Sequence, residues 1–372
     1  KDDKIVIFGS YGGRYAGGNS KPVFDYLRAM SDCPLECYYF LKSKQNEPGY
    51  VSMYPLTLKT YLLFLRAKTL VMTHTLWDLG RLKPSRRKYQ IHLWHGHSGP
   101  KSDGYASKRL TKENLADIDK HAPFITKFLA TSRINLYFWA FAKVLHPRQF
   151  LPMGFPRNDI LLRKDIQEKV LRNIFPDLPH DCKVILYAPT YRLYAETKFY
   201  PFNDFNRDDL ERWMTDNNIV ILLRYHMGEE KPIEVSDRIR EIGSDKCQEI
   251  NEVLHEIDIL ITDYSSISSD FMLLDKPIIY SAFDQEIFER YEGFIFGNYD
   301  FWAPGPKVHT YQDFKKEIED VLSGEDRYSE QRRAINRLIN EYQTENSTKQ
   351  VAQFLIQFLT NKESRGYDAR KI

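Results

Sequence analysis

Short apolar runs alternate with amphipathic stretches along almost the whole chain. Most runs are apolar throughout rather than at alternate positions, which is typical of strands that helices cover on both faces of a parallel sheet. Amphipathic stretches such as residues 133–145 and 165–175 lie between the runs and favour helices. The pattern therefore predicts an α/β fold with doubly wound parallel sheets. The runs expected to form strands are residues 4–8, 69–73, 89–94, 127–131, 183–188, 219–224, 258–262 and 277–281.

The runs fall into two groups, separated by the segment GFPRND at residues 154–159. Because 372 residues are too many for one ordinary core, we expect two such domains facing one cleft, residues 1–155 and 156–345. Apolar residues return at helical spacing near the end of the sequence. This spacing predicts that residues 346–372 form a helix that packs back on the first domain, followed by a polar tail. The residues on its apolar face are Val351, Phe354, Leu355, Phe358 and Leu359.

Composition narrows the possible partners. Hydrophobic residues make up 42% and charged residues 28%, which is a globular composition. The net charge of +2 gives no argument for nucleic acid as a partner. The four cysteines, Cys33, Cys37, Cys182 and Cys247, form no Cys-x-x-Cys pair and no disulfide framework, which favours a reducing cytosol. The sequence shows no signal peptide and no apolar run of about 18 residues, so we expect no membrane-spanning segment.

The segment DYSS at residues 263–266 lies where a predicted strand changes into a predicted helix. The first backbone N–H groups of a helix lack internal partners, and the helix dipole is positive there. A pyrophosphate could accept from these groups and from the hydroxyls of Ser265 and Ser266. The position is also the carboxyl end of a strand, where open α/β sheets bind ligands. The alternative is that Ser266 serves only as a helix N-cap.

Cationic side chains follow two other buried strands of the same half. Arg192, Arg224 and His226 are all expected at the same edge of the sheet as the two serines. Arginine suits phosphate because its planar guanidinium makes paired hydrogen bonds. Together these residues predict a diphosphate site. Asp270, one helical turn beyond Ser266, could accept from ribose hydroxyls or could be a solvated acid.

Three histidines, His92, His95 and His97, follow a strand of the first half. Their proximity raises the possibility of a metal site, but no cluster of Cys, Asp or Glu accompanies them. We therefore expect no metal and no cofactor. The sharper hypothesis is that His95, at the turn before Gly96, is a general base, and the alternative is a polar loop histidine. The glycine-rich segment 9–20 is neither a dinucleotide fingerprint nor a P-loop, and it could contact an acceptor or be a plain mobile loop.

A basic region surrounds a predicted amphipathic helix at residues 58–66. The region suits the anionic headgroups of a membrane surface, although a buried helix with a solvated loop would explain it equally well. The basic residues are Lys59, Arg66, Lys68, Arg81, Lys83, Arg86, Arg87 and Lys88.

Several motifs together resemble the CDP-glycerol glycerophosphotransferase family, the teichoic-acid primases and polymerases of bacterial envelopes. The motifs are LWHG (93–96), GFPRND (154–159), ILYAPTYR (185–192), LLRYH (222–226), ITDYSSISSDFMLLDKPIIY (261–280) and APGP (303–306). The resemblance covers the chain from the first strand to about Pro306. It implies a GT-B architecture, in which two Rossmann-like domains face a deep cleft. The nucleotide donor would lie mainly on the C-terminal half and the acceptor mainly on the N-terminal half.

The resemblance also implies a reaction. Glycerol phosphate would move from CDP-glycerol to a hydroxyl of a lipid-linked glycan, a teichoic acid or a capsule acceptor, and CMP would be released. His95 would take the proton of the acceptor hydroxyl, with His226 as the second catalytic residue. Arg192, His226 and the two serines would hold the diphosphate, assisted by Arg224. Such enzymes work in the cytoplasm, peripherally on the inner face of the cytoplasmic membrane.

The chain departs from the family pattern after Trp-His-Gly, where the family continues Thr-Pro-Leu-Lys and this chain has residues 97–101, HSGPK. The acceptor would lie near this loop, so its identity stays open. The single GT-B module fits a primase or a short capsule-type enzyme. The alternatives are a GT-B glycosyltransferase that uses a nucleotide sugar, a CDP-ribitol enzyme, a binding module without catalysis and a metal-dependent hydrolase. The oligomeric state is not predicted.

Overall fold

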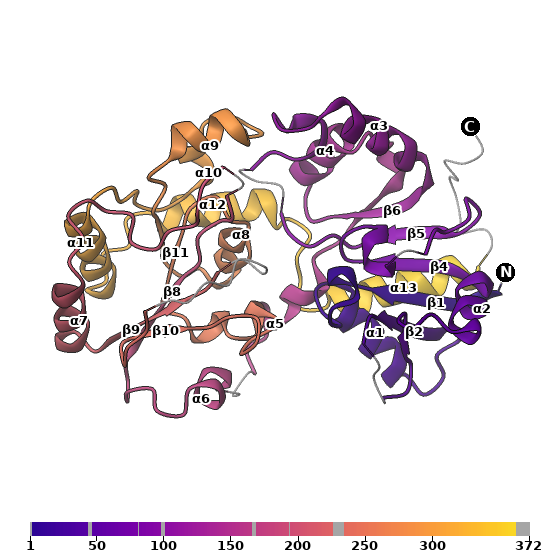
Figure 1. Cartoon of the computed structure of the whole chain (residues 1–372), viewed down its shortest axis with the longest axis horizontal. Coiled ribbons are helices and arrows are strands. Elements are labelled where there is room, and N and C mark those ends of the chain that lie inside the picture. The colour runs from indigo at the N-terminus through magenta and orange to yellow at the C-terminus, as the bar shows by residue number, and fades with distance from the viewer. Residues whose placement is uncertain are drawn as a thin grey trace. The chain divides into compact units, whose positions relative to one another are not determined.

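The computed structural model describes residues 2–43, 47–80, 82–97, 101–165, 169–192, 194–225 and 234–361. The chain folds into two compact units (Figure 1). Unit 1 comprises residues 1–97, 110–160 and 340–372, and unit 2 comprises residues 98–109 and 161–339. Each unit is built on one parallel sheet, so the expected α/β class with parallel sheets is confirmed.

The sheet of unit 1 has the strand order β3-β2-β1-β4-β5-β6-β7 within the described residues. All its neighbouring strands are parallel, and most of the connections contain a helix. The strands are β1 (Asp2–Gly9), β2 (Glu36–Leu41), β3 (Tyr50–Ser52), β4 (Ala67–Met72), β5 (Tyr89–His92), β6 (Ile125–Ala130) and β7 (Phe150–Pro152). The helices are α1 (Ser20–Ala29), α2 (Leu58–Arg66), α3 (Lys112–His121), α4 (Arg133–Ala142) and α13 (Ser347–Thr360), with α5 (Asp159–Leu162) where the chain passes into unit 2.

The sheet of unit 2 has the order β10-β9-β8-β11-β12 and is also parallel throughout its described strands. Its strands are β8 (Lys183–Tyr187), β9 (Ile219–Leu223), β10 (Ile239–Glu241), β11 (Ile259–Thr262) and β12 (Ile278–Tyr280). Its helices are α6 (Val170–Ile174), α7 (Arg207–Asp216), α8 (Ile267–Phe271), α9 (Gln285–Tyr291), α10 (Tyr299–Trp302), α11 (Tyr311–Leu322) and α12 (Ser329–Ile339). Helices α7 and α11 pack their apolar faces on the central strands to form the core of this unit.

All eight strands expected from apolar runs are present, as β1, β4, β5, β6, β8, β9, β11 and β12. The structure adds β2, β3, β7 and β10, which lie at or next to the edges of the two sheets. Of these, β3 (YVS), β7 (FLP) and β10 (IRE) are short and contain a polar residue or a proline, so they form no apolar run like that of β12. The expected helix at 133–145 corresponds to α4, whereas only residues 170–174 of the expected helix at 165–175 are described as helical.

Helix α13 belongs to unit 1, where it packs against α1 and β1 (Figure 1). The side chain of Asp159 accepts hydrogen bonds from the backbone N–H groups of Ser347 (3.0 Å) and Thr348 (2.7 Å), at the start of the helix. These bonds satisfy donors that the helix itself leaves unpaired. Of the apolar face expected from the sequence, Val351, Leu355, Phe358 and Leu359 are buried and Phe354 is half-buried.

The four cysteines are free thiols, in agreement with the absence of a disulfide framework in the sequence. Lys88, counted among the basic surface residues, is in fact buried. Its ammonium donates to the carbonyl oxygens of Phe64 and Ala67, at the C-terminal end of α2. Burial with these acceptors is favourable because the last carbonyls of a helix lack partners. No helix among the described residues has both the length and the apolar character needed to cross a bilayer.

Candidate functional site

The carboxyl ends of β1, β4 and β5 in unit 1 carry the loops that hold the candidate base. The LWHG motif begins directly after β5, and Trp94 adopts a left-handed backbone conformation with φ of 56°. Such a conformation is strained for a residue with a bulky side chain and needs support from its surroundings. The amide of Asn19, at the end of the glycine-rich loop, gives that support by donating to the carbonyl oxygens of Leu93 (3.1 Å) and Trp94 (2.8 Å). The loop after β1 is therefore part of the scaffold of the LWHG turn.

The GFPRND motif supports the same turn from another side. The guanidinium of Arg157 donates to the carbonyl oxygen of His95 at 2.8 Å, and its backbone N–H donates to Asn19 Oδ1 at 3.2 Å. Three segments far apart in the sequence thus meet at His95. Its side chain is half-buried.

His74, which follows β4, is a neighbour of His95 that the sequence reasoning did not single out. The two imidazoles stack with ring centroids 4.2 Å apart and an interplanar angle of 15°. Asp78 lies fully buried beneath them and accepts from the backbone N–H groups of His74 (2.6 Å) and Gly12 (3.0 Å). Its carboxylate also lies 3.4 Å from Nδ1 of His74. The available signal was the position of His74 at the carboxyl end of a predicted strand, the same criterion that identified His95.

The environment of His95 favours the neutral imidazole. Burial, the neighbouring His74 and the guanidinium of Arg157 together hold the pKa of His95 well below its ordinary value. A histidine with such a pKa is unprotonated at neutral pH. It can therefore accept a proton without first having to lose one, as a general base must.

The other two histidines of the motif region are interior residues. Nδ1 of His92 lies 3.3 Å from the carbonyl oxygen of His74, and burial lowers the pKa of His92 to about 4. His97 is buried against Phe155, with Nδ1 3.1 Å from the hydroxyl of Thr131. The three histidines thus have separate partners. Among the residues that the structure describes, no group of three His, Cys, Asp or Glu side chains could hold a metal ion.

The DYSS turn of unit 2 follows β11 and leads into α8. Ser266 occupies the N-cap position of α8, yet its side chain makes no capping hydrogen bond. Within the described part of the chain, the hydroxyls of Ser265 and Ser266 have no hydrogen-bond partner, and both residues are half-exposed. The purely structural role of an N-cap therefore does not account for Ser266. Two adjacent hydroxyls remain available to an external acceptor such as a phosphate oxygen.

Arg192 lies beneath this turn and is fully buried. Its guanidinium donates to Asp284 (2.6 and 2.8 Å) and to the carbonyl oxygen of Thr190 (2.7 Å), and it pairs with Asp263 at 2.9 Å. Asp263 in turn accepts from the backbone N–H groups of Thr190 (2.8 Å) and Tyr264 (2.6 Å). The carboxyl ends of β8 and β11 are thereby tied together. A direct contact between Arg192 and a diphosphate would require these ion pairs to break. In this structure Arg192 positions the turn.

Tyr264 completes the network beneath the serines. Its hydroxyl donates to Asp284 at 3.0 Å, and its ring stacks on Phe288 with centroids 3.8 Å apart. Burial alone would raise the pKa of Asp284, but the donors on Arg192 and Tyr194 outweigh that effect and lower it. The aromatic ring of the DYSS motif is therefore a core residue that anchors the turn.

The remaining predicted site residues of unit 2 have varied positions. Arg224 donates to the carbonyl oxygens of Ile242 (3.0 Å) and Cys247 (2.8 Å), and so holds the loop after β10. Asp270 is only 2% exposed and lies 3.5 Å from the amide of Asn251, so it is not the solvated acid of the alternative interpretation. A ribose contact through Asp270 would require its exposure. His226 lies outside the described residues.

Lys101 is a further cation of unit 2, although it follows the LWHG motif in sequence. It pairs with Phe294 through an isolated β-bridge, and its side chain is half-buried. Burial lowers the pKa of its ammonium group, and no ion-pair partner for it occurs among the described residues. The lysine that ends the corresponding family pattern was the signal that could have identified it.

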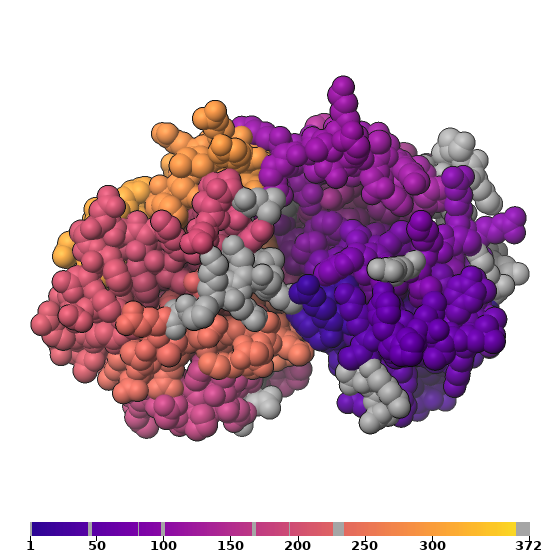
Figure 2. Space-filling view, in the orientation of Figure 1, coloured from indigo at the N-terminus to yellow at the C-terminus, as the bar shows by residue number. Residues whose placement is uncertain are grey.

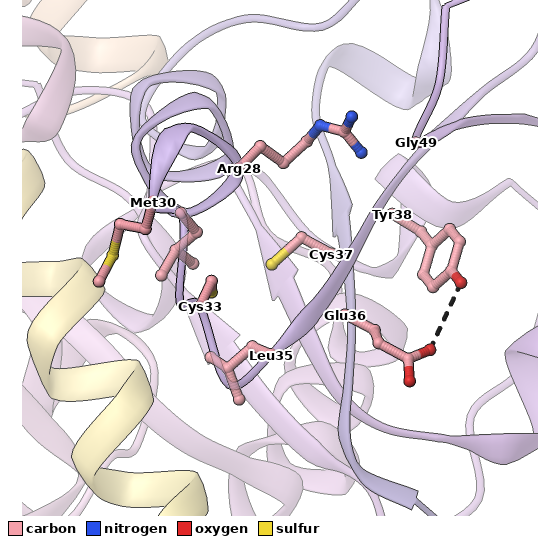
Figure 3. Close-up of a pocket in the computed structure, with 9 residues that line it drawn as sticks. Arg28, Met30, Cys33, Leu35, Glu36, Cys37, Tyr38 and Gly49 are labelled. Carbon is pink, nitrogen blue, oxygen red and sulfur yellow. Dashed lines mark hydrogen bonds between the residues drawn. The ribbon is translucent and has the colours of Figure 1, made fainter.

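A cavity of about 310 Å³ in unit 1 lies at the opposite edge of the sheet (Figure 3). Arg28, Cys33, Glu36 and Cys37 line it, at the amino end of β2. Burial raises the pKa of the Cys37 thiol to about 12, so the reactive thiolate is not populated at neutral pH. Because parallel α/β sheets bind ligands at their carboxyl edges, we do not assign the reaction to this cavity.

The fold is shared with a wall teichoic acid polymerase. A structure of a TagF variant soaked with CDPG has a TM-score of 0.80 and 22% sequence identity, and the match covers 98% of this chain and 90% of that chain. The sequence profile described as CDP-Glycerol:Poly(glycerophosphate) glycerophosphotransferase matches residues 1–357. The chain belongs to this family, as its motifs indicated.

Curated relatives in this family include enzymes of different length. The teichoic acid ribitol-phosphate polymerase TarL of Staphylococcus aureus (strain NCTC 8325 / PS 47) is 28% identical over 65% of this chain and 43% of its own length. A teichoic acid poly(glycerol phosphate) polymerase of Bacillus spizizenii (strain ATCC 23059 / NRRL B-14472 / W23) is 27% identical over 83% of this chain and 82% of its own. The match thus spans less than half of TarL.

Proposed function

We propose that this protein transfers glycerol phosphate from CDP-glycerol to a hydroxyl of a lipid-linked glycan or of a teichoic-acid or capsule acceptor, with release of CMP. The observation that carries the proposal is the state of His95, a neutral, half-exposed imidazole at the carboxyl edge of its sheet. Membership in the glycerophosphotransferase family and the likeness to TagF support the choice of donor.

The proposal includes a GT-B arrangement, in which two Rossmann-like domains bind different substrates. Unit 1 would bind the reacting hydroxyl of the acceptor and supply His95, and unit 2 would bind most of the nucleotide donor. The free hydroxyls of Ser265 and Ser266 support the assignment of the diphosphate to unit 2. Lys101 adds a cation on the same unit.

The proposed chemistry is one phosphoryl transfer. The acceptor oxygen forms a bond to the glycerol-side phosphorus, the phosphoanhydride bond to CMP breaks, and the hydroxyl proton passes to Nε2 of His95. Nδ1 of this ring is buried, which leaves Nε2 as the nitrogen that can meet the acceptor. Ser265 and Ser266 donate to the phosphate oxygens, and His226 serves as the second catalytic residue. Catalysis of this kind depends mostly on positioning and on stabilisation of charge.

Ribitol phosphate is the second candidate for the transferred group, because TarL is a ribitol-phosphate polymerase by name. In the proposed mechanism, the site residues contact the phosphates or the transferred proton and do not contact the polyol. They therefore suit CDP-glycerol and CDP-ribitol equally well.

We further propose that α2 rests on the inner face of the cytoplasmic membrane. Leu58, Tyr61, Leu62 and Leu65 share one side of the helix, and all are exposed, Leu58 by 73%. The alternative of a buried helix does not fit this face. An exposed apolar face flanked by cations suits an anionic lipid surface. The flanking exposed cations are Lys59, Arg66, Lys83, Arg86 and Arg87.

The reaction is tested by measuring CMP release with a lipid-linked disaccharide acceptor and, in parallel, CDP-glycerol, CDP-ribitol or a nucleotide sugar. We expect release from CDP-glycerol, undiminished by a chelator. Turnover of the nucleotide sugar alone would identify a glycosyltransferase, and loss of all activity in chelator would point to metal-dependent chemistry. Binding of CDP-glycerol without any turnover would mean that the protein is a binding module and not an enzyme.

A further inference from the structure

Unit 2 contains a cavity of about 480 Å³ that the proposed site does not use. It lies between residues 194–198, which follow the APTYR motif, and the segment 283–291, which contains α9. Its size is within the range of small-molecule sites. In Figure 1, α9 stands at the periphery of unit 2, and Figure 2 shows side chains of this region at the surface.

Aromatic and aliphatic side chains form much of the wall. The rings of Tyr194 and Tyr291 stack with centroids 5.2 Å apart and an interplanar angle of 21°. Tyr291, Ile287 and Phe283 are 51%, 50% and 38% exposed, although all are large apolar side chains. Apolar surface left open to water in a concave site is typical of a binding surface. Stacked aromatic rings present flat faces that suit the C–H groups of polyhydroxy compounds.

The cavity also carries unpaired positive charge. Lys198 and Arg290 line it, and neither has a hydrogen-bond or ion-pair partner within the described part of the chain. Of the two acidic residues in the lining, Asp284 is engaged by Arg192, Tyr194 and Tyr264, whereas Glu196 is exposed. Free guanidinium and ammonium groups beside aromatic rings favour a ligand with phosphate groups.

Asp284 connects this cavity with the DYSS turn. One carboxylate accepts from the hydroxyl of Tyr194 (2.6 Å), in the cavity wall, and from the hydroxyl of Tyr264 (3.0 Å), next to Ser265. The cavity wall and the DYSS turn therefore share one carboxylate partner.

We propose that this cavity binds a phosphodiester-linked polyol chain, the anionic part of an acceptor that already carries polyol phosphate units. The proposal rests on the proposed function. Tyr194 and Tyr291 would contact the carbon faces of the polyols, and Lys198 and Arg290 would pair with the phosphates. The site favours an acceptor that has been extended over one that has not.

The test measures binding of a fluorescently labelled glycerol phosphate oligomer to the whole chain, without turnover. Tyr291→Ala and Arg290→Glu should each weaken binding at least about tenfold, the effect of losing one good stacking or ionic contact. The matched controls are Tyr137→Ala, which removes an exposed tyrosine of α4, and Arg212→Glu, which makes the same charge change on α7. We expect both controls to bind like the wild type, and all four variants to keep the KM for CDP-glycerol.

Several outcomes would overturn the proposal. The first is that the wild type does not bind the oligomer, and the second is that the control variants lose as much affinity as the cavity variants. The third is displacement of the oligomer by CMP, which would make the cavity part of the nucleotide site. Displacement by inorganic phosphate as effective as by unlabelled oligomer would reduce the cavity to a general anion site. CMP release by the wild type is measured separately, so failure of the proposed reaction is distinguishable from failure of this inference.

Discussion

At the scale of single residues, His95 combines access to the surface with a low pKa. The LWHG turn leaves the imidazole partly exposed, and the groups around the ring lower its pKa. Burial, His74 and Arg157 all oppose protonation of His95. His95 therefore stays unprotonated below the pH at which an ordinary histidine protonates, about 6.5, as the proposed base would need to.

Replacement of His95 by alanine should lower kcat by about 10²–10⁴-fold, the usual contribution of a positioned general base. The melting temperature should change little, because Asn19 and Arg157 hold the turn through its backbone carbonyl oxygens. His180→Ala, which changes an exposed histidine of unit 2, is the control. CMP release and thermal unfolding are the two measurements, and near-full activity of the His95 variant would remove it from the mechanism.

Replacement of His74 by phenylalanine keeps a ring stacked on His95 but removes the ring nitrogens. We expect the pKa of His95 to rise, since His74 is one of the groups that lower it, along with Arg157 and Lys143. The acid limb of the kcat/KM–pH profile should therefore move to higher pH, with the plateau retained. His74→Ala should lower the plateau as well, because it also removes the stack. An unchanged profile in both variants would show that His74 does not act through His95.

His92 should make the protein less stable in mild acid. Its folded-state pKa of about 4 is below the unfolded value of 6.5. Between these pH values the unfolded state binds a proton and the folded state does not. Stability is thus lost as pH falls from 6.5 towards 4, by up to about 3 kcal/mol from this residue. His92→Phe, which preserves contact with Phe128, should flatten the dependence of the unfolding free energy on pH in this window. Denaturant titrations at several pH values measure it.

At the scale of elements, the DYSS turn places unpaired hydroxyls next to groups that are buried in the fold. Ser265 and Ser266 present free hydroxyls, whereas Arg192, Asp263, Tyr264 and Asp284 are joined in a buried network. The two kinds of residue are adjacent in sequence. Substitution of the serines should nevertheless change donor binding, whereas substitution within the network should change stability.

The double substitution Ser265→Ala and Ser266→Ala should raise the KM for CDP-glycerol and leave the melting temperature unchanged. Asp284→Asn should instead destabilise the protein by about 1.5–3 kcal/mol, because it weakens the charge-assisted hydrogen bonds from Arg192 while Asp263 still pairs with that charge. Thermal unfolding and donor kinetics on the same preparations distinguish the two. A large loss of stability in the serine variant would mean that the hydroxyls have a structural role.

The elements that the sequence predicts well are those with a strong periodic signal. The eight strands within apolar runs and α13 were expected because each buries a continuous or helically spaced set of residues. The edge strand β3 is only three residues long, and β2 contains four polar or aromatic residues in six, so neither has a clear pattern. At the candidate site, position after a strand singled out His95 and the two serines, whose roles stay predictions. It could not show that Arg192 would be buried, because burial depends on Asp263 and Asp284, which are distant in sequence.

At the scale of the whole molecule, the stability of unit 1 depends on its last helix. Leu355 of α13 is fully buried, in a helix that packs on α1 and β1. Leu355→Ala should destabilise the protein by about 2–5 kcal/mol, as for other large-to-small substitutions in cores. Leu338→Ala, in the exposed part of α12, is the control. Comparable melting temperatures for the two variants would show that α13 contributes little.

The place of α13 in the chain also orders events during synthesis. Unit 2 is nearly complete when residue 339 has been made, whereas α1 and β1 of unit 1 still lack the helix that covers them. Domains generally fold as units while the chain emerges from the ribosome. Unit 2 can therefore mature first, and unit 1, which carries His95, is completed only when translation has passed Thr360. A ribosome that stops before α13 would release a chain in which α1 and β1 lack their cover, so we expect early termination to leave the loops around His95 without a folded support.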